Sequence, residues 1–237
     1  MRWLFAGVVM ILSVSAMRAD DFFNGKDTAG WKGLEAHWSV KEGAIHGTTQ
    51  PKGINFNTFL CSEKEYGDFE LSMKVKLSPN GNSGVQVRSK VVDKEKWVVA
   101  GPQCDMGQQY WGSLYGERFG GMMKAADAAT VKQVVKVGEF NDYYILCKGK
   151  HVTIKINGTT MVDEDFEKMP EKGIIAFQIH GGGAMDVVFK DLVFKDLSAA
   201  VSKPGHIGGH HAVVEDEHHR SSGIRGFLRR VFPSSRR

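Results

Sequence analysis

The sequence predicts an all-β fold, a two-sheet antiparallel jelly-roll sandwich, for two reasons. Short alternations of apolar and polar residues recur along the 237 residues and are separated by turns rich in Gly, Asn and Pro. Outside the N-terminal apolar stretch, no pattern with the helical period lasts longer than two turns. Strands that are apolar on one face bury that face most simply in two packed sheets.

The clearest strand covers residues 69–77, where apolar and polar residues alternate without a break. Residues 131–137 are predicted to be extended, and the polar-aromatic segment 97–119 is predicted to contain little core strand. The remaining predicted strands flank turn signals such as Asn157-Gly158; they are 38–40, 44–46, 83–88, 142–147, 151–156, 173–180 and 185–195.

Composition divides the chain into three parts. Residues 1–19 carry Arg2 before an apolar run and then small residues, as in a cleaved secretory signal peptide. The run is too short for a comfortable membrane span, so we expect a secreted or periplasmic protein of the cell envelope. Residues 20–198 form the predicted jelly-roll domain, and residues 199–237 form a basic tail, rich in His and Arg, that we expect to be mostly disordered.

The net charge of +4 comes from the two ends of the chain. Without residues 1–19 and 199–237, 22 basic and 24 acidic residues remain, so nothing favours a nucleic-acid-binding domain. The tail could contact an anionic envelope polymer, or a membrane surface through a short amphipathic piece near 224–232, although a solvated tail is the simpler interpretation.

Three cysteines, Cys61, Cys104 and Cys147, are expected to be small buried hydrophobic residues. Their number is odd and no two form a CxxC pair. One disulfide in an oxidising compartment remains open, but the sequence does not choose the pair.

The segment 173–183 combines a predicted core face with a predicted polar face. In an extended strand Phe177 and Ile179 point to one side, and Gln178 and His180 point to the other. The glycines at 181–183 allow a backbone to come close. The polar face could therefore be the floor of a binding site.

The same parity argument adds other side chains to this floor. Gln86 and Arg88 lie opposite two valines, and Gln103 and Asp105 are two residues apart. Carboxylates and amides suit sugar hydroxyls, and aromatic rings suit sugar C–H faces. The catalytic candidates are Arg88, Asp105, Glu117 and His180, and the substrate-binding candidates are Asn82, Gln86, Gln103, Trp111, Tyr115 and Gln178.

Each catalytic candidate has a structural alternative. His180 could be a hydrogen-bonded structural histidine, and Arg88 could pair with an acid and hold the sheet together. Asp105 could cap the turn that follows it, and Glu117 could be a solvated edge residue.

Short motifs follow one another in order along the chain: FNGKD at 23–27 with Gly30-Trp31, WSVKEG at 38–43, YGDFEL at 66–71, NSGV at 82–85, QCD at 103–105, LYG at 114–116, FNDY at 140–143, Asn157-Gly158, Gln178 with His180, and FKDL at 189–192. In this ordered set, over residues 22–197, the chain resembles the 3-keto-disaccharide hydrolase family. Two features depart from that pattern: Phe140 replaces the usual Trp, and the tail lies outside it.

The resemblance implies a concanavalin A-like jelly roll with its ligand site on the concave face. It also implies activity on glycosides oxidised at carbon 3, with a 3-keto sugar glycoside as the carbohydrate partner. In one mechanism His180 or Asp105 removes the proton on carbon 2, Arg88 or a metal stabilises the enolate, and an acid such as Glu117 assists the leaving group. In the other, Asp105 and Glu117 cleave the glycosidic bond directly. Elimination is preferred, because the keto group acidifies the proton on carbon 2.

No cofactor follows with certainty. Asp105, Glu117 and His180 offer oxygen and nitrogen atoms that could bind a divalent metal, but their spacing does not identify a metal site. A non-catalytic, lectin-like carbohydrate-binding module is the rival function, since the same fold serves both classes. A surface-assembly protein docked through its basic tail is a third interpretation.

Overall fold

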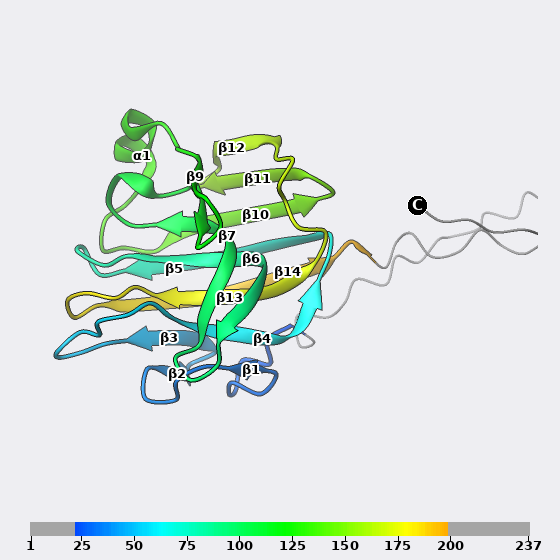
Figure 1. Ribbon diagram of the computed structural model, residues 1–237. Coiled ribbons are helices and arrows are strands. Elements are labelled where there is room, and N and C mark those ends of the chain that lie inside the picture. The colour runs from blue at the N-terminus through cyan, green and yellow to red at the C-terminus, as the bar shows by residue number, and fades with distance from the viewer. Residues whose placement is uncertain (1–21, 199–237) are drawn as a thin grey trace, which may run out of the picture. The chain divides into compact units, whose positions relative to one another are not determined.

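Two seven-stranded antiparallel sheets pack face to face in the computed structural model, which describes residues 22–198 (Figure 1). The first sheet has the order β1-β4-β13-β6-β7-β8-β9. Its strands are β1 (Trp31–Lys32), β4 (Thr58–Tyr66), β13 (Gly173–Ile179), β6 (Ser83–Asp93), β7 (Val98–Met106), β8 (Leu114–Glu117) and β9 (Gly121–Lys124). The signal peptide and tail predicted at 1–19 and 199–237 lie outside the described residues.

The second sheet has the order β12-β11-β10-β5-β14-β3-β2. All the pairings in both sheets are antiparallel, which confirms the predicted sandwich. The strands of the second sheet are β12 (Thr159–Asp165), β11 (His151–Ile156), β10 (Asn141–Lys148), β5 (Phe69–Leu77), β14 (Asp186–Asp196), β3 (Ala44–Thr48) and β2 (Trp38–Lys41).

The strand β5 forms where the alternation predicted it. Its odd-numbered residues are buried, including Leu71 and Val75 with no exposed surface, and its even-numbered residues are partly or fully exposed. The strand lies between β10 and β14, so its backbone groups pair on both edges. A period of two is therefore enough to orient a central strand whose second face meets solvent.

Aromatic rings join the two sheets. Phe177 on β13 lies 4.5 Å from Phe189 on β14, and Trp31 on β1 lies 5.2 Å from Phe177, measured between ring centroids. Phe22 stacks on Phe194 at 4.2 Å and closes the same cluster. Such contacts stabilise a core by roughly 0.5–1.5 kcal/mol each beyond the burial of their area. These rings identify the face of the first sheet that packs against the second sheet.

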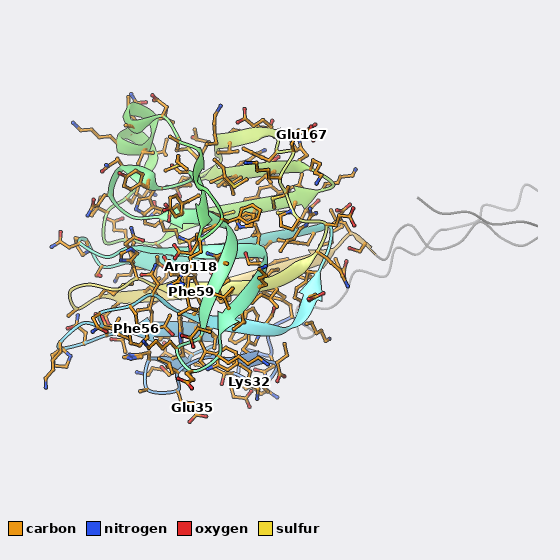
Figure 2. All side chains as sticks on the ribbon, viewed as in Figure 1. Lys32, Glu35, Phe56, Phe59, Arg118 and Glu167 are labelled. Atoms are coloured by element: carbon orange, nitrogen blue, oxygen red, sulfur yellow. The ribbon has the colours of Figure 1, made fainter. Side chains whose placement is uncertain are left out.

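A smaller apolar cluster covers the opposite face of the first sheet. It contains Phe59 on β4, with Cys61, Val99 and Ala176. In Figure 2 Phe59 is labelled over the middle of the ribbon, and Lys32, Glu35 and Glu167 are labelled near its edges. The outer face of this sheet is therefore part apolar and part polar, and the polar part carries the site described below.

The prediction of an extended piece at 131–137 is wrong. A short helix, α1 (Ala128–Val134), occupies most of it. The carboxylate of Asp127 caps the helix by accepting a hydrogen bond from the Thr130 backbone N–H at 2.8 Å. Three valines that the pattern attributed to a strand, at 131, 134 and 135, follow the helical i, i+3, i+4 spacing instead.

The prediction of little core strand in 97–119 is also wrong. Strand β7 (Val98–Met106) is buried along all nine residues, between β6 and β8. It is followed by a single 3-10 turn, η2 (Gln108–Tyr110), and by β8. Its polar residues Gln103 and Asp105 are buried because they bond to other polar side chains, which composition does not reveal.

The three cysteines are buried free thiols, as expected of core residues. Burial raises the pKa of Cys61 and of Cys147 to about 12, so neither is a reactive thiolate. Within residues 22–198, none of the helices has the length and apolarity needed to cross a membrane.

Candidate functional site

A cavity of about 460 Å³ lies over β7, β8 and the end of β13, on the face of the first sheet that points away from the core. It brings together the predicted catalytic side chains Asp105, Glu117 and His180. Its lining is mostly polar and comprises Asn57, Asn82, Gln103, Asp105, Tyr110, Tyr115, Glu117, Met122, Gln178 and His180.

Asp105 is the most buried ionisable group of this cavity. Its side chain lies on the outer face of β7, and its Oδ1 lies 2.9 Å from the side-chain amide of Gln103. Burial raises the pKa of Asp105 to about 6, and the nearby Glu117 carboxylate adds to the rise. A hydrogen bond from the Met106 backbone N–H and the charge of His180 oppose it. The group can therefore gain or lose a proton near neutral pH.

The backbone of Asp105 is held from three directions. Its N–H donates to the carbonyl of Ser113, and its carbonyl accepts from the N–H of Gly112, both at 2.9 Å. The hydroxyl of Tyr143 donates to the same carbonyl at 3.0 Å. Tyr143 belongs to β10 of the second sheet, so the core itself fixes the position of this carboxyl.

His180 follows the last residue of β13, and its side chain is exposed in the cavity. Its Nδ1 lies 2.6 Å from the carbonyl oxygen of Gly181. A carbonyl only accepts, so Nδ1 carries the proton and Nε2 of the neutral ring keeps a free lone pair. This tautomer leaves Nε2 available as a base.

The loop after His180 lies close against residue 56. A Cβ added at Gly181 would meet the backbone of Phe56 at 2.8 Å, so only glycine fits there without a shift. Gly182 forms an isolated bridge with Ile54 through two backbone hydrogen bonds of 2.6 and 3.1 Å. The predicted close approach of a backbone to these glycines is confirmed, although the approaching group belongs to the protein itself.

Asn57 links this loop to Glu117. Its Oδ1 accepts from the Gly181 backbone N–H at 2.8 Å, and its Nδ2 donates to Glu117 Oε1 at 3.3 Å. One amide therefore positions both the loop beside the imidazole and the carboxylate on β8.

Three buried glutamine amides lie behind Asp105. Gln103 lies 3.2 Å from Gln178 and 2.9 Å from Gln86, measured between amide atoms. Gly84 makes room for them, because a Cβ there would lie 2.6 Å from the Gln103 side chain. Gln103 and Gln178 line the cavity as predicted, whereas Gln86 lies beneath it and does not.

The prediction that Arg88 shares this floor is wrong. The register of β6 shifts between Gln86 and Lys90, and Arg88 has a φ of 48°. The side chain is turned away from the cavity and its guanidinium is buried. It donates to the carbonyls of Gly67 at 2.7 Å, Gly149 at 2.6 Å and Pro170 at 2.9 Å, and to Asp68 Oδ1 at 2.8 Å. This is the structural alternative, an arginine that ties loops together.

The prediction that Trp111 binds substrate is not supported by its position. Its ring packs in the core, with a centroid 6.3 Å from that of Tyr143, and does not line the cavity. Three lining residues escaped sequence analysis: Asn57, Tyr110 and Met122. They lie before β4, in η2 and on β9, where no alternation of long strands assigns a face.

A larger cavity, of about 660 Å³, lies over the second sheet near Phe140. The ammonium groups of Lys190 and Lys76 lie 4.1 and 5.9 Å from the centre of the Phe140 ring. Its lining mixes lysines and acids without a convergent set of buried polar groups, which is the feature that marks a ligand site. We therefore assign the site to the smaller cavity. Among residues 22–198, no group of three or more His, Cys, Asp or Glu side chains is arranged to hold a metal ion.

Solved structures share this fold at low sequence identity. A "putative glycosyl hydrolase" from Parabacteroides distasonis matches with a TM-score of 0.55 and 23% identity, over 74% of this chain and 92% of its own. A second such protein from the same organism gives 0.53 and 22%, over 71% and 94%. The carbohydrate-binding module CBM66 from Bacillus subtilis gives 0.51 and 12%, over 70% and 96%.

No curated protein sequence matches the chain significantly. The family model of the 3-keto-alpha-glucoside-1,2-lyase-like domain matches residues 18–195, which include the whole cavity and every described strand except the last residue of β14. Membership supports a carbohydrate-active function, and the polar cavity with its imidazole and two carboxyls agrees with it. The chain therefore belongs to the 3-keto-alpha-glucoside-1,2-lyase-like family.

Proposed function

We propose that this protein cleaves glycosides whose sugar carries a keto group at carbon 3, by elimination across carbons 1 and 2 followed by hydration. The observation that carries the proposal is the convergence of His180, Asp105 and Glu117 on one cavity. The 1,2-lyase named in the family description is consistent with this order of steps.

Elimination begins at carbon 2, whose proton is acidified by the neighbouring ketone. A base takes the proton, and the electron pair of the C–H bond forms an enolate with the oxygen on carbon 3. Collapse of the enolate forms a double bond between carbons 1 and 2 and breaks the bond from carbon 1 to the leaving oxygen. That oxygen receives a proton from an acid, and water then adds across the double bond.

His180 is the base in this proposal, since its Nδ1 donates to Gly181 and leaves Nε2 free to accept a proton. Asp105 and Glu117 are the two carboxyls that can protonate the leaving oxygen. Arg88 takes no part, because its three nitrogens donate to Asp68 and to backbone carbonyls, and it does not line the cavity.

The polar lining suits a ligand with hydroxyl groups. The side-chain amides of Asn57, Asn82, Gln103 and Gln178 contribute donors and acceptors to it. Tyr110 and Tyr115 add rings and hydroxyls to the same wall.

The experiment is incubation of the protein with 3-keto-trehalose and 3-keto-glucosides in deuterium oxide. We expect release of 3-keto-glucose carrying deuterium on carbon 2. His180→Ala should lower turnover at least a hundredfold, the usual contribution of a general base. Release without deuterium would contradict elimination and favour direct hydrolysis by the two carboxyls.

A carbohydrate-binding module of the same fold is the second candidate, because CBM66 shares the architecture. The two functions predict opposite behaviour of the variants. An enzyme loses turnover in His180→Ala and keeps its affinity, whereas a binding module shows no turnover and loses affinity in Tyr110→Ala and Tyr115→Ala. No release from any keto-glycoside would therefore favour the binding module.

We also propose that the protein acts outside the cytoplasm, on the basis of the signal-like sequence at 1–19. Cell fractionation of a strain that expresses the full chain tests this. Comparison with a chain lacking 199–237 tests whether the basic tail retains the protein at an anionic surface.

A further inference from the structure

The buried end of the glutamine cluster is in contact with fixed carbonyl groups. Gln86 has no exposed surface, and one atom of its amide lies 2.7 Å from Ser89 Oγ, 3.1 Å from the Pro102 carbonyl oxygen and 3.2 Å from that of Gly101. Backbone carbonyls accept and never donate. The amide atom that faces them is therefore Nε2, since Oε1 in its place would oppose two oxygens.

This orientation determines the next amide. With Nε2 of Gln86 turned to the carbonyls, its Oε1 lies 2.9 Å from the Gln103 amide and needs a donor. Gln103 must therefore present Nε2 to Gln86, which turns its own Oε1 toward Asp105 and Gln178. The orientations of the Gln86 and Gln103 amides are then defined without reference to Asp105.

The Gln178 amide is compatible with the same orientation of Gln103. With Gln103 Nε2 turned outward, Gln178 Oε1 accepts from it and Gln178 Nε2 is buried with no acceptor among the described residues. With Gln103 Oε1 turned outward, Gln178 can place Nε2 at 3.2 Å from that oxygen, and its Oε1 then takes the position without a partner. Gln178 therefore makes one bond to Gln103 in either orientation and is compatible with the one that the carbonyls of Gly101 and Pro102 impose.

Only one contact remains, the 2.9 Å between Gln103 and Asp105 Oδ1. When Gln103 presents Oε1 there, Asp105 must supply the hydrogen, which an ionised carboxylate lacks. We propose that the amide chain of Gln86, Gln103 and Gln178 keeps Asp105 as a neutral carboxylic acid in the ligand-free protein, and so assigns to Asp105 the role of proton donor.

This inference rests on the proposed function for its catalytic meaning. Asp105 gives its proton to the leaving oxygen, so the O–H bond of the acid breaks and one forms on the departing group. The new carboxylate keeps the hydrogen bond from the Met106 backbone N–H and the favourable charge of His180. Gln86 is then a positioning residue, which acts on the acid only through Gln103.

None of the other groups described around Asp105 supplies the hydrogen that the contact between Asp105 and Gln103 Oε1 requires. Glu117 on β8 opposes ionisation of Asp105, whereas His180 after β13 and the Met106 backbone N–H favour it. Tyr143 on β10 bonds to the Asp105 backbone carbonyl and leaves the carboxyl untouched. The neighbouring Cys104 is a buried neutral thiol.

The experiment is titration of the Asp105 carboxyl in the full chain, by ¹³C NMR of protein labelled at aspartate, with Asp105→Asn to assign the signal. We expect a midpoint at or above pH 6 in the unsubstituted protein. Gln86→Met keeps an unbranched side chain of similar length and removes the amide, so Gln103 can turn Nε2 to Asp105. The midpoint should fall by about one unit, roughly tenfold in proton affinity.

Gln133→Met is the control, because Gln133 is an exposed amide on α1 and should leave the midpoint unchanged. A midpoint near the ordinary aspartate value in the unsubstituted protein would overturn the proposal, with no variant needed. An unchanged midpoint in Gln86→Met would overturn the role of the chain. The titration uses no substrate. It therefore tests the protonation of Asp105 separately from the proposed function, even when no keto-glycoside is cleaved.

Discussion

Arg88 contributes to this molecule as a tie between loops. Its guanidinium reaches the loop before β5, the turn after β10 and the segment before β13 through Asp68 and three carbonyls. A buried arginine with that many acceptors is inseparable from the fold, because removing it leaves several groups unpaired at once. A charged residue that strand alternation assigns to the face of a site can therefore have a purely structural role.

We predict that Arg88→Met destabilises the protein by about 3 kcal/mol or more. The cause is the loss of donors to three carbonyls and of the ion pair with Asp68. Urea unfolding, followed by tryptophan fluorescence, measures the change. Lys90→Met, an exposed lysine on the same strand, serves as the matched control. A stability equal to that of the control would show that these contacts are dispensable.

At the scale of elements, the loop after β13 joins the base to the rest of the site. Gly181 lies against Phe56, its N–H bonds to Asn57, and its carbonyl bonds to His180. Because one residue carries all three contacts, a small shift of this loop moves the imidazole and loosens Glu117 through Asn57. The loop therefore positions the imidazole directly and the Glu117 carboxylate through Asn57.

We predict that Gly181→Ala lowers turnover of the keto-glycoside roughly tenfold or more, because its Cβ would lie 2.8 Å from the Phe56 backbone and displace the loop. Gly183→Ala is the control, since a Cβ there meets nothing within 4 Å. Turnover and thermal midpoint are measured for both. Equal turnover in the two variants would contradict the role given to the loop.

At the scale of the whole molecule, the folded protein buries an acid, Asp105, whose burial opposes folding at neutral pH. The pKa of Asp105 is about 6 in the folded protein and near its ordinary value of 3.8 in the unfolded chain. Between these values the folded state binds a proton that the unfolded state has released. A rise in pH through this window therefore lowers the free energy of unfolding.

We predict that Asp105→Asn is more stable than the unsubstituted protein at pH 7.5, by on the order of 2–3 kcal/mol, and that the gain disappears near pH 4. The amide cannot ionise, so it avoids the cost of a buried charge. Urea unfolding at both pH values tests this, with exposed Glu95→Gln as the control. A gain of equal size at both pH values would point to packing instead of ionisation.

Sequence alone determined the sandwich and part of the site. A period of two gave β5 and β10 their faces, and placed Gln103 with Asp105, and Gln178 beside His180, on the wet side of their strands. These pairs could be predicted because two residues apart in a regular strand always share a face. The family resemblance was drawn over residues 22–197, and the family model matches residues 18–195.

Tertiary structure decided what parity could not. The register shift in β6 directs Arg88 away from the cavity, and Trp111 packs in the core. Asn57 entered the site from a loop, where no period assigns a direction. The direction of each amide in the glutamine chain depends on carbonyls of Gly101 and Pro102 that only strand pairing brings near Gln86. Hydrogen-bond direction belongs to the assembled set of groups, so it exists only once the sheet is formed.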